Sequence, residues 1–123
     1  MTAQHDHSVR IREGKIVLAG VFGLPADPRG VVVFAHGSGS GRLSPRNTFV
    51  ARHLQQVGLA TVLLDLLTEE EADDRHKVFD INLLADRLLL AKHWVETEER
   101  TRGLPIGYFG ASTGAGAALQ AAA

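Results

Sequence analysis

Three largely apolar segments constrain the fold of this chain more than any other feature of its sequence. They cover residues 31–35, 59–64 and 105–109, and they lack the regular polar and apolar alternation of a half-buried strand. Apolar runs of this length are typical of strands that are buried on both faces of a parallel sheet. Helical patterns separate the three segments, so the sequence predicts an α/β fold with right-handed crossover connections.

The first crossover is expected to be a helix that begins after Ser44 and ends before Gly58. A serine followed by Pro45 is typical of a helix N-cap with proline at the first helical position, and glycine is a common residue at a helix end. The residues that recur at helical spacing within this segment are Phe49, Val50, His53, Leu54 and Val57.

The second crossover is expected to contain a longer helix capped by Asp80 and ended by Gly103 and Pro105. The positions that share one face at helical spacing are Ile81, Leu84, Ala85, Leu88, Ala91 and Val95. Before this helix, residues 68–77 form a polar loop or short helix. Its carboxylates, at residues 69–71 and 73–74, are expected to form a solvated face.

The N-terminal part is expected to form a hairpin over about residues 9–23. Apolar residues alternate with charged ones before the turn at Gly14 and Lys15, and an apolar strand follows. With 123 residues in total, the chain is expected to form one domain over residues 1–123, from the hairpin through a β-α-β-α-β unit to the start of a last helix.

Composition excludes several functional classes. The net charge of −1 argues against a nucleic-acid-binding protein, which normally carries a basic surface. With no cysteine, the chain has no disulfide framework and no thiolate metal site, and residues 5–7 (His-Asp-His) lie in an expected tail without a fixed third metal ligand. No apolar run approaches the ~20 residues of a membrane helix. We therefore expect a cytoplasmic protein with no membrane contact, cofactor or metal.

The pattern Gly110-Ala111-Ser112-Thr113-Gly114 is the main functional motif. It matches G-x-S-x-G, with a strand-like run before it and an Ala/Gly-rich helical stretch after it. This context is typical of a nucleophile elbow, in which a tight turn exposes the serine hydroxyl at the carboxyl end of the sheet. Ser112 is therefore the predicted nucleophile, and the alternative is a Gly/Ala-rich turn with an unreactive serine.

A second Gly/Ser-rich segment, residues 36–42, follows the first buried strand. In hydrolases with a nucleophile elbow, this position supplies a backbone donor to the oxyanion hole. Ser38 or Gly39 would supply one N–H group, and Thr113, directly after the nucleophile, would supply the other. The alternative is a loop that binds a small anion before a helix, although the loop lacks the Gly-Lys-Ser/Thr ending of a P-loop.

Other polar residues near the ends of the strands have simpler expected roles. His36 is expected to order its loop by hydrogen bonding rather than to act as a base. Asp65 could line a pocket or order a loop. Arg42 and Arg46 could meet an anionic substrate, but we expect them to face solvent.

Four motifs together resemble the dienelactone hydrolase-like branch of the α/β hydrolases. They are FAHGSGS at residues 34–40, SPRN at 44–47, LDLLT at 64–68 and GYFGASTG at 107–114. The resemblance covers about residues 10–123, and members of this branch also occur fused to phosphoribosyltransferase domains. It implies a mostly parallel sheet flanked by helices and hydrolysis of a small-molecule ester or lactone through an acyl-enzyme. It also implies Ser112 as nucleophile and an oxyanion region at Ser38, Gly39 and Thr113.

The sequence departs from this family after the elbow. No Asp, Glu or His follows Ser112, whereas the family's acid and histidine follow the serine in chain order. We therefore expect the N-terminal part of an α/β hydrolase, truncated after the elbow, inactive alone, and prone to pair through its open sheet edge with itself or a complementing chain. A fragment, a split enzyme and a non-catalytic module that binds an anion or a partner remain alternatives.

Overall fold

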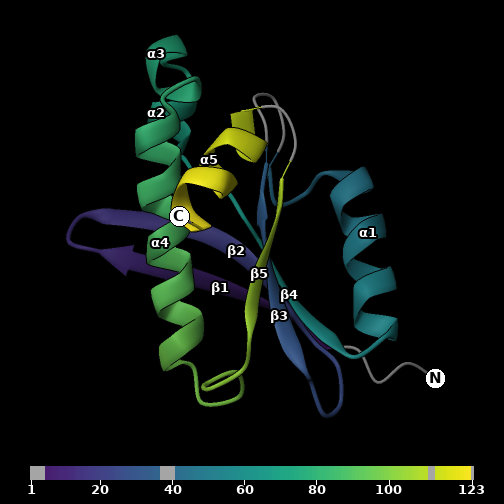
Figure 1. Ribbon diagram of the computed structural model, residues 1–123. Helices are drawn as coiled ribbons and strands as arrows, with labels where there is room; N and C mark the ends of the chain where they lie inside the picture. Colours follow the sequence, from purple (N-terminus) through teal and green to yellow (C-terminus); the bar gives the residue numbers. More distant parts are fainter. Residues whose placement is uncertain (1–4, 37–40, 111–112, 123) are drawn as a thin grey trace.

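One β-sheet lies between two layers of helices in the computed structural model of this chain, which describes residues 5–36, 41–110 and 113–122 (Figure 1). The strands are β1 (His5–Glu13), β2 (Ile16–Leu24), β3 (Gly30–Ala35), β4 (Leu59–Leu64) and β5 (Ile106–Gly110). The helices are α1 (Pro45–Gln56), α2 (Glu69–Ala72), α3 (Arg75–Val78), α4 (Ile81–Thr97) and α5 (Thr113–Ala122). Among the described residues, none of these helices has the length and apolar character that a membrane crossing requires.

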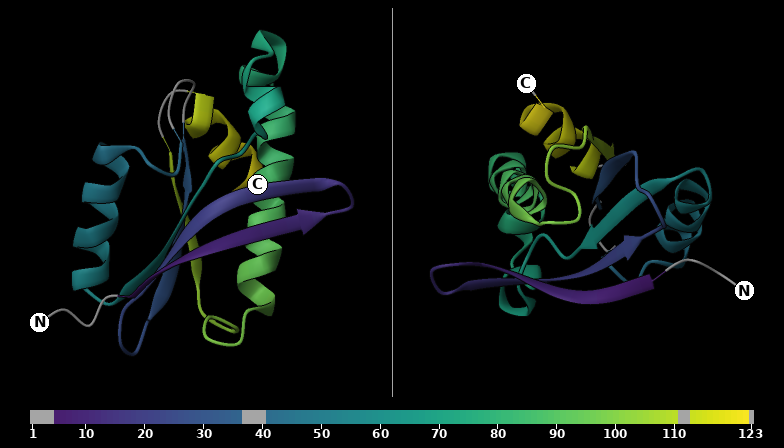
Figure 2. Two further views of the ribbon diagram at one scale, coloured as in Figure 1. Left: turned by 180° about the vertical axis from the view of Figure 1, so that it is seen from behind. Right: turned by 90° about the horizontal axis from the view of Figure 1, so that it is seen from below.

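The five strands lie in the order β1-β2-β4-β3-β5. The central strand β3 is parallel to β4 and to β5, whereas β2 is antiparallel to β1 and to β4. The predicted N-terminal hairpin and the predicted parallel strands are therefore both confirmed, and together they form a mixed sheet. α1 covers one face of this sheet, and α4 and α5 cover the other (Figures 1 and 2).

Each face of the sheet has its own hydrophobic core. The larger core lies under α4 and α5, where Phe22 and Leu88 are completely buried. The Phe22 ring meets the Trp94 ring of α4 edge-on, with 5.3 Å between ring centroids. The smaller core lies under α1 and is centred on Phe34 and Ala51. Burial on both faces explains why β3 and β4 are apolar along nearly their whole length.

β5 is less buried than the sequence predicted. Its residues alternate between half-buried and exposed, and Phe109 is 39% exposed. The reason is the position of the strand, because β5 pairs with β3 on one side and forms an edge of the described sheet. The prediction of a third strand was right, but the prediction that it is buried like β3 and β4 was wrong for this structure.

The N-terminal histidines do not lie in a tail. β1 begins at His5, which pairs with Leu24 at the end of β2, so the hairpin is longer than the sequence pattern indicated. The Asp6 carboxylate lies 3.3 Å from the Arg52 guanidinium of α1. Regular pairing with β2 continues past the apolar residues, and polar composition alone therefore mispredicted this segment.

α1 begins as predicted, but its inner face differs from the apolar pattern. The Ser44 hydroxyl accepts a hydrogen bond from the Asn47 amide at 3.3 Å, and Gly58 follows the helix with φ +91°. The buried residues of α1 are Asn47, Ala51 and Gln55, whereas Phe49 and His53 are exposed, as is Val57 at the C-cap. Gln55 can be buried because it donates a hydrogen bond to the buried Thr61 hydroxyl at 2.7 Å.

Arg87 forms a buried polar centre on the inner face of α4. Its guanidinium donates two hydrogen bonds of 2.7 Å to the two carboxylate oxygens of Glu71, and a third of 3.1 Å to the Leu66 carbonyl. Glu71 was expected on a solvated face, but only 11% of its side chain is exposed. This prediction was wrong because Glu71 closes a capping box with Thr68 at the start of α2, which turns the carboxylate towards Arg87.

The Glu71–Arg87 pair predicts a specific loss of stability in acid. The Arg87 hydrogen bonds are the largest cause that lowers the pKa of Glu71 from 4.5 to about 2. A carboxylate whose pKa is lower in the folded state stabilises the fold above its unfolded pKa, and this contribution is lost as the pH falls through 4.5 towards 2. We expect Glu71 to account for about 3 kcal/mol of this loss.

Urea unfolding across this pH range would measure the effect in the wild-type chain and in Glu71→Gln. The variant is expected to be less stable at neutral pH and to have a flatter dependence of unfolding free energy on pH. Glu70→Gln, at an exposed position of the same helix, should retain the wild-type pH dependence. Parallel pH curves for wild type and Glu71→Gln would contradict the assignment.

Candidate functional site

The carboxyl ends of β3 and β5 meet at one edge of the sheet. Ala35 lies opposite Gly110 in the parallel pairing of the two strands, so the chain leaves both strands at neighbouring positions (Figure 1). The loop over residues 36–42 and the turn into α5 therefore start side by side. The described starts of the two segments that the sequence singled out therefore lie close together.

The predicted site residues are only partly described. Ser112, Ser38 and Gly39 lie outside the described residues, and Thr113 is the first residue of α5. The strand predicted before the G-x-S-x-G motif and the helix predicted after it are both present, because β5 ends at Gly110 and α5 begins at Thr113.

Two glycines allow the turn into α5 to approach the sheet. A Cβ atom at Gly110 would lie 2.8 Å from the Gly114 carbonyl oxygen. A Cβ atom at Gly114 would overlap the Ala35 carbonyl oxygen and would lie 2.5 Å from the carbonyl oxygen of His36. Sequence reasoning assigned both glycines to a tight turn. It missed that Gly114 packs on the end of β3, a contact between segments far apart in the sequence.

Asp65 holds the far end of the loop over residues 36–42. It follows β4 and accepts a hydrogen bond from the Arg42 amide at 2.6 Å, and its other carboxylate oxygen pairs with the Arg42 guanidinium. The side chain of Arg42 is 34% exposed, so the expectation that it faces solvent was wrong. Arg46 is exposed, as expected.

His36 and Arg87 bind the backbone N–H and the backbone carbonyl of the next residue, Leu66. The Leu66 amide donates a hydrogen bond to Nε2 of His36 at 2.9 Å, and the Leu66 carbonyl accepts the bond from Arg87. A backbone N–H can only donate, so Nε2 carries a lone pair and not a proton in this arrangement. The predicted role of His36 in ordering its loop agrees with this contact.

This geometry limits the acid-base chemistry of the described residues. A general base must present a lone pair within hydrogen-bond reach of the proton that it removes. The accepting nitrogen of His36 is bonded to Leu66, and the Asp65 carboxylate is bonded to Arg42. These two groups are therefore parts of the scaffold at the sheet edge. Within residues 5–36, 41–110 and 113–122, no cluster of three or more potential metal-ligating side chains occurs.

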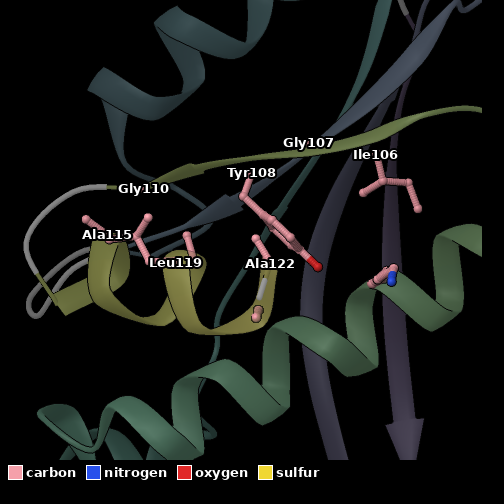
Figure 3. Close-up of a pocket in the computed structure, with 10 residues that line it drawn as sticks. Ile106, Gly107, Tyr108, Gly110, Ala115, Leu119 and Ala122 are labelled. Carbon is pink, nitrogen blue, oxygen red and sulfur yellow. The ribbon is translucent and has the colours of Figure 1, made fainter.

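A pocket of about 590 Å³ lies between β5, α5 and α4 (Figure 3). The Tyr108 side chain extends into it. Lys92 of α4 is among its lining residues. Within the described residues, the buried Tyr108 hydroxyl has no hydrogen-bond partner, and burial raises the pKa of this phenol. Among the described residues near the candidate site, Gly110 and Ala115 line this pocket.

The close approach of α5 to β3 predicts the effect of Gly114→Ala. Helix propensity alone favours the variant, because glycine inside a helix costs about 0.5–1 kcal/mol relative to alanine. The added methyl group would instead overlap backbone carbonyls, which cannot rotate away, so we expect a net loss of about 3 kcal/mol. Chemical denaturation would measure this loss.

Gly107→Ala is the matched control, because a Cβ at Gly107 meets nothing within 4 Å. A Gly114→Ala variant with wild-type stability would disprove the contact between Gly114 and the end of β3.

The fold and sequence match those of solved hydrolases. The crystal structure of a dienelactone hydrolase from Anabaena variabilis superposes with a TM-score of 0.92 and 51% identity, over 98% of this chain and 57% of that chain. A dienelactone hydrolase-like promiscuous phosphotriesterase from metagenomic libraries has a TM-score of 0.79 at 19% identity, over 98% of this chain and 54% of its own. A cold-adapted esterase from an Arctic intertidal metagenomic library has a TM-score of 0.79 at 17% identity, over 97% of this chain and 55% of the esterase. These last two show the fold alone.

Curated relatives carry a different name. A Mycobacterium tuberculosis protein, found in two strains and named "Putative phosphoribosyl transferase", is 56% identical over 118 residues. The match covers 96% of this chain but 27% of that protein. The chain therefore spans about a quarter of the length of the curated relatives that it matches. No protein-family model matches the chain. The mixed sheet, the helices on both of its faces and the match to about half of the Anabaena enzyme together show that the fold of this chain matches the N-terminal part of a dienelactone hydrolase α/β fold.

Proposed function

We propose that this chain carries the nucleophile part of a serine hydrolase site that acts on small-molecule esters or lactones. Ser112 is the nucleophile, and the backbone N–H of Thr113, with that of Ser38 or Gly39, forms the oxyanion hole. The site lies at the carboxyl edge of β3 and β5. The similarity to a dienelactone hydrolase at 51% identity supports the reaction class.

The observation that carries this proposal is the contact of Gly114 with the end of β3. It joins the turn that contains Ser112 to the strand that leads into residues 36–42. An oxyanion hole requires backbone donors from both segments around one oxygen atom. A glycine at this contact is what allows the two segments to come that close.

The proposed reaction has two steps. The Ser112 hydroxyl oxygen attacks the carbonyl carbon while a base removes its proton, and the negative oxygen that forms is stabilised by the backbone donors. The C–O bond to the alcohol then breaks, and the alcohol leaves with that proton. Water attacks the resulting acyl-enzyme, which releases the acid and restores the Ser112 hydroxyl.

The acid and histidine of the site are proposed to come from outside these 123 residues. No Asp, Glu or His follows Ser112 in this sequence, and the accepting nitrogen of His36 is bonded to Leu66. Loss of a triad member lowers the rate by several orders of magnitude but leaves oxyanion stabilisation in place. The chain by itself is therefore expected to react slowly.

Anion binding by a non-catalytic module is the alternative. The loop over residues 36–42 is Gly/Ser-rich, and the name of the Mycobacterium tuberculosis relatives refers to a phosphoribosyl group. The charge at this edge does not favour that function, because the Arg42 guanidinium is already paired with the Asp65 carboxylate. We therefore prefer the hydrolase assignment.

Labelling with a fluorophosphonate probe would test the proposal. We expect slow labelling of the wild-type chain and acceleration by added imidazole, because imidazole can supply the missing general base in solution. Ser112→Ala should reduce labelling to background. Circular dichroism would confirm that both proteins are folded.

Two results would contradict the proposal. Labelling that persists in Ser112→Ala would show that another group reacts with the probe. A folded wild-type chain that stays unlabelled with imidazole, but binds inorganic phosphate at the loop, would favour the anion-binding module.

A further inference from the structure

We propose that Asp65 and Arg42 are a positioning pair, and that they hold the C-terminal end of the loop over residues 36–42 at Gly41 and Arg42. This inference rests on the proposed function, because that loop carries the proposed oxyanion residues Ser38 and Gly39. Neither Asp65 nor Arg42 is proposed to touch the substrate.

The first support is the number of contacts that Asp65 makes with two adjacent residues of the loop. Its Oδ1 accepts the Arg42 amide at 2.6 Å, and its Oδ2 pairs with the Arg42 guanidinium. The same Oδ1 would lie 2.6 Å from a Cβ atom at Gly41. The carboxylate therefore binds the loop through one residue and packs directly on the preceding one.

The second support is that Gly41 leaves the space that the Asp65 carboxylate occupies. The methyl group of an alanine at position 41 would lie too close to Oδ1 of Asp65 and would displace the carboxylate. Glycine at this position thus maintains the Asp65–Arg42 contacts.

The third support is that Leu66, the residue after Asp65, binds the other end of the loop at His36. Asp65 donates its own amide to the Ala19 carbonyl of β2 at 2.9 Å, which fixes the segment after β4. Leu66 then holds His36 at the start of the loop, and Asp65 holds Arg42 at its end. One dipeptide therefore anchors both ends of the loop.

Such anchoring matters because oxyanion donors act only at hydrogen-bond distance from the developing charge. A backbone donor that is displaced by ~1 Å loses most of its effect on the transition state. Substrate binding depends less on this distance. The pair should thus affect the bond-forming rate more than the affinity.

A double-mutant cycle of Gly41→Ala and Asp65→Ala would test the contact. Hydrogen exchange of the Arg42 amide, measured by NMR, is the primary readout and does not require a reactive serine. We expect each single variant to accelerate exchange about tenfold or more, and the double variant to be no faster than Asp65→Ala, because both changes act through one contact. Independent, multiplying effects would overturn the proposal.

Two further variants separate size from charge. Asp65→Asn keeps the shape and an acceptor for the Arg42 amide, so its effect should be smaller than that of Asp65→Ala. Asp65→Glu keeps the charge but adds a methylene group where Oδ1 already packs on Gly41, so it should be as harmful as Asp65→Ala. Arg46→Gln changes an exposed arginine of the same region and should leave Arg42 exchange unchanged. Full retention of slow exchange in Asp65→Glu would contradict the packing argument.

Fluorophosphonate kinetics with imidazole would then distinguish positioning from a structural role. Positioning predicts that Asp65→Ala lowers the bond-forming rate constant about tenfold while the apparent affinity for the probe stays the same. A structural role alone would lower the labelled fraction and leave the rate constant of the folded fraction unchanged, which would overturn the proposal. If the wild-type chain is not labelled, the proposed function fails, and the Arg42 exchange data still decide whether the pair holds the loop.

Discussion

The hydrogen bonds of the Leu66 backbone are the interactions on which the candidate site depends most. Leu66 is fully buried two residues after the end of β4, and buried backbone groups without hydrogen bonds would be costly. His36 accepts its N–H and Arg87 donates to its carbonyl. Because His36 directly follows β3 and Arg87 lies on α4, the backbone of one residue joins the sheet edge to a helix layer.

An ion pair and two glycines support the contacts around Leu66. Glu71 neutralises Arg87, so that a guanidinium can remain buried beside the Leu66 carbonyl. At the same edge of the sheet, Gly41 leaves space for the Asp65 carboxylate, and Gly114 leaves space for the end of β3. The same region thus combines hydrogen-bonded polar groups with positions at which a larger side chain would not fit.

Local patterns predicted most elements correctly, since their physical causes are local. The N-caps at Ser44 and Asp80 and the helix end at Gly58 are set by neighbouring residues. The roles of Glu71 and Arg42 were mispredicted because their partners, Arg87 and Asp65, lie 16 and 23 residues away in the sequence. The Thr68–Glu71 spacing of a capping box was a sequence indication that Glu71 is turned back towards the helix start.

The sequence by itself determined the alternation of strands and helices, the strand-turn-helix context of Ser112 and the family resemblance. Short-range periodicity, capping and glycine content determine these features. Only the tertiary structure decided that polar Gln55 and Arg87 are inside while Phe49 is outside, and that Gly114 packs on β3. The reason is that burial and close approach depend on which distant segment lies opposite a residue, and helical or strand periodicity carries no information about that partner.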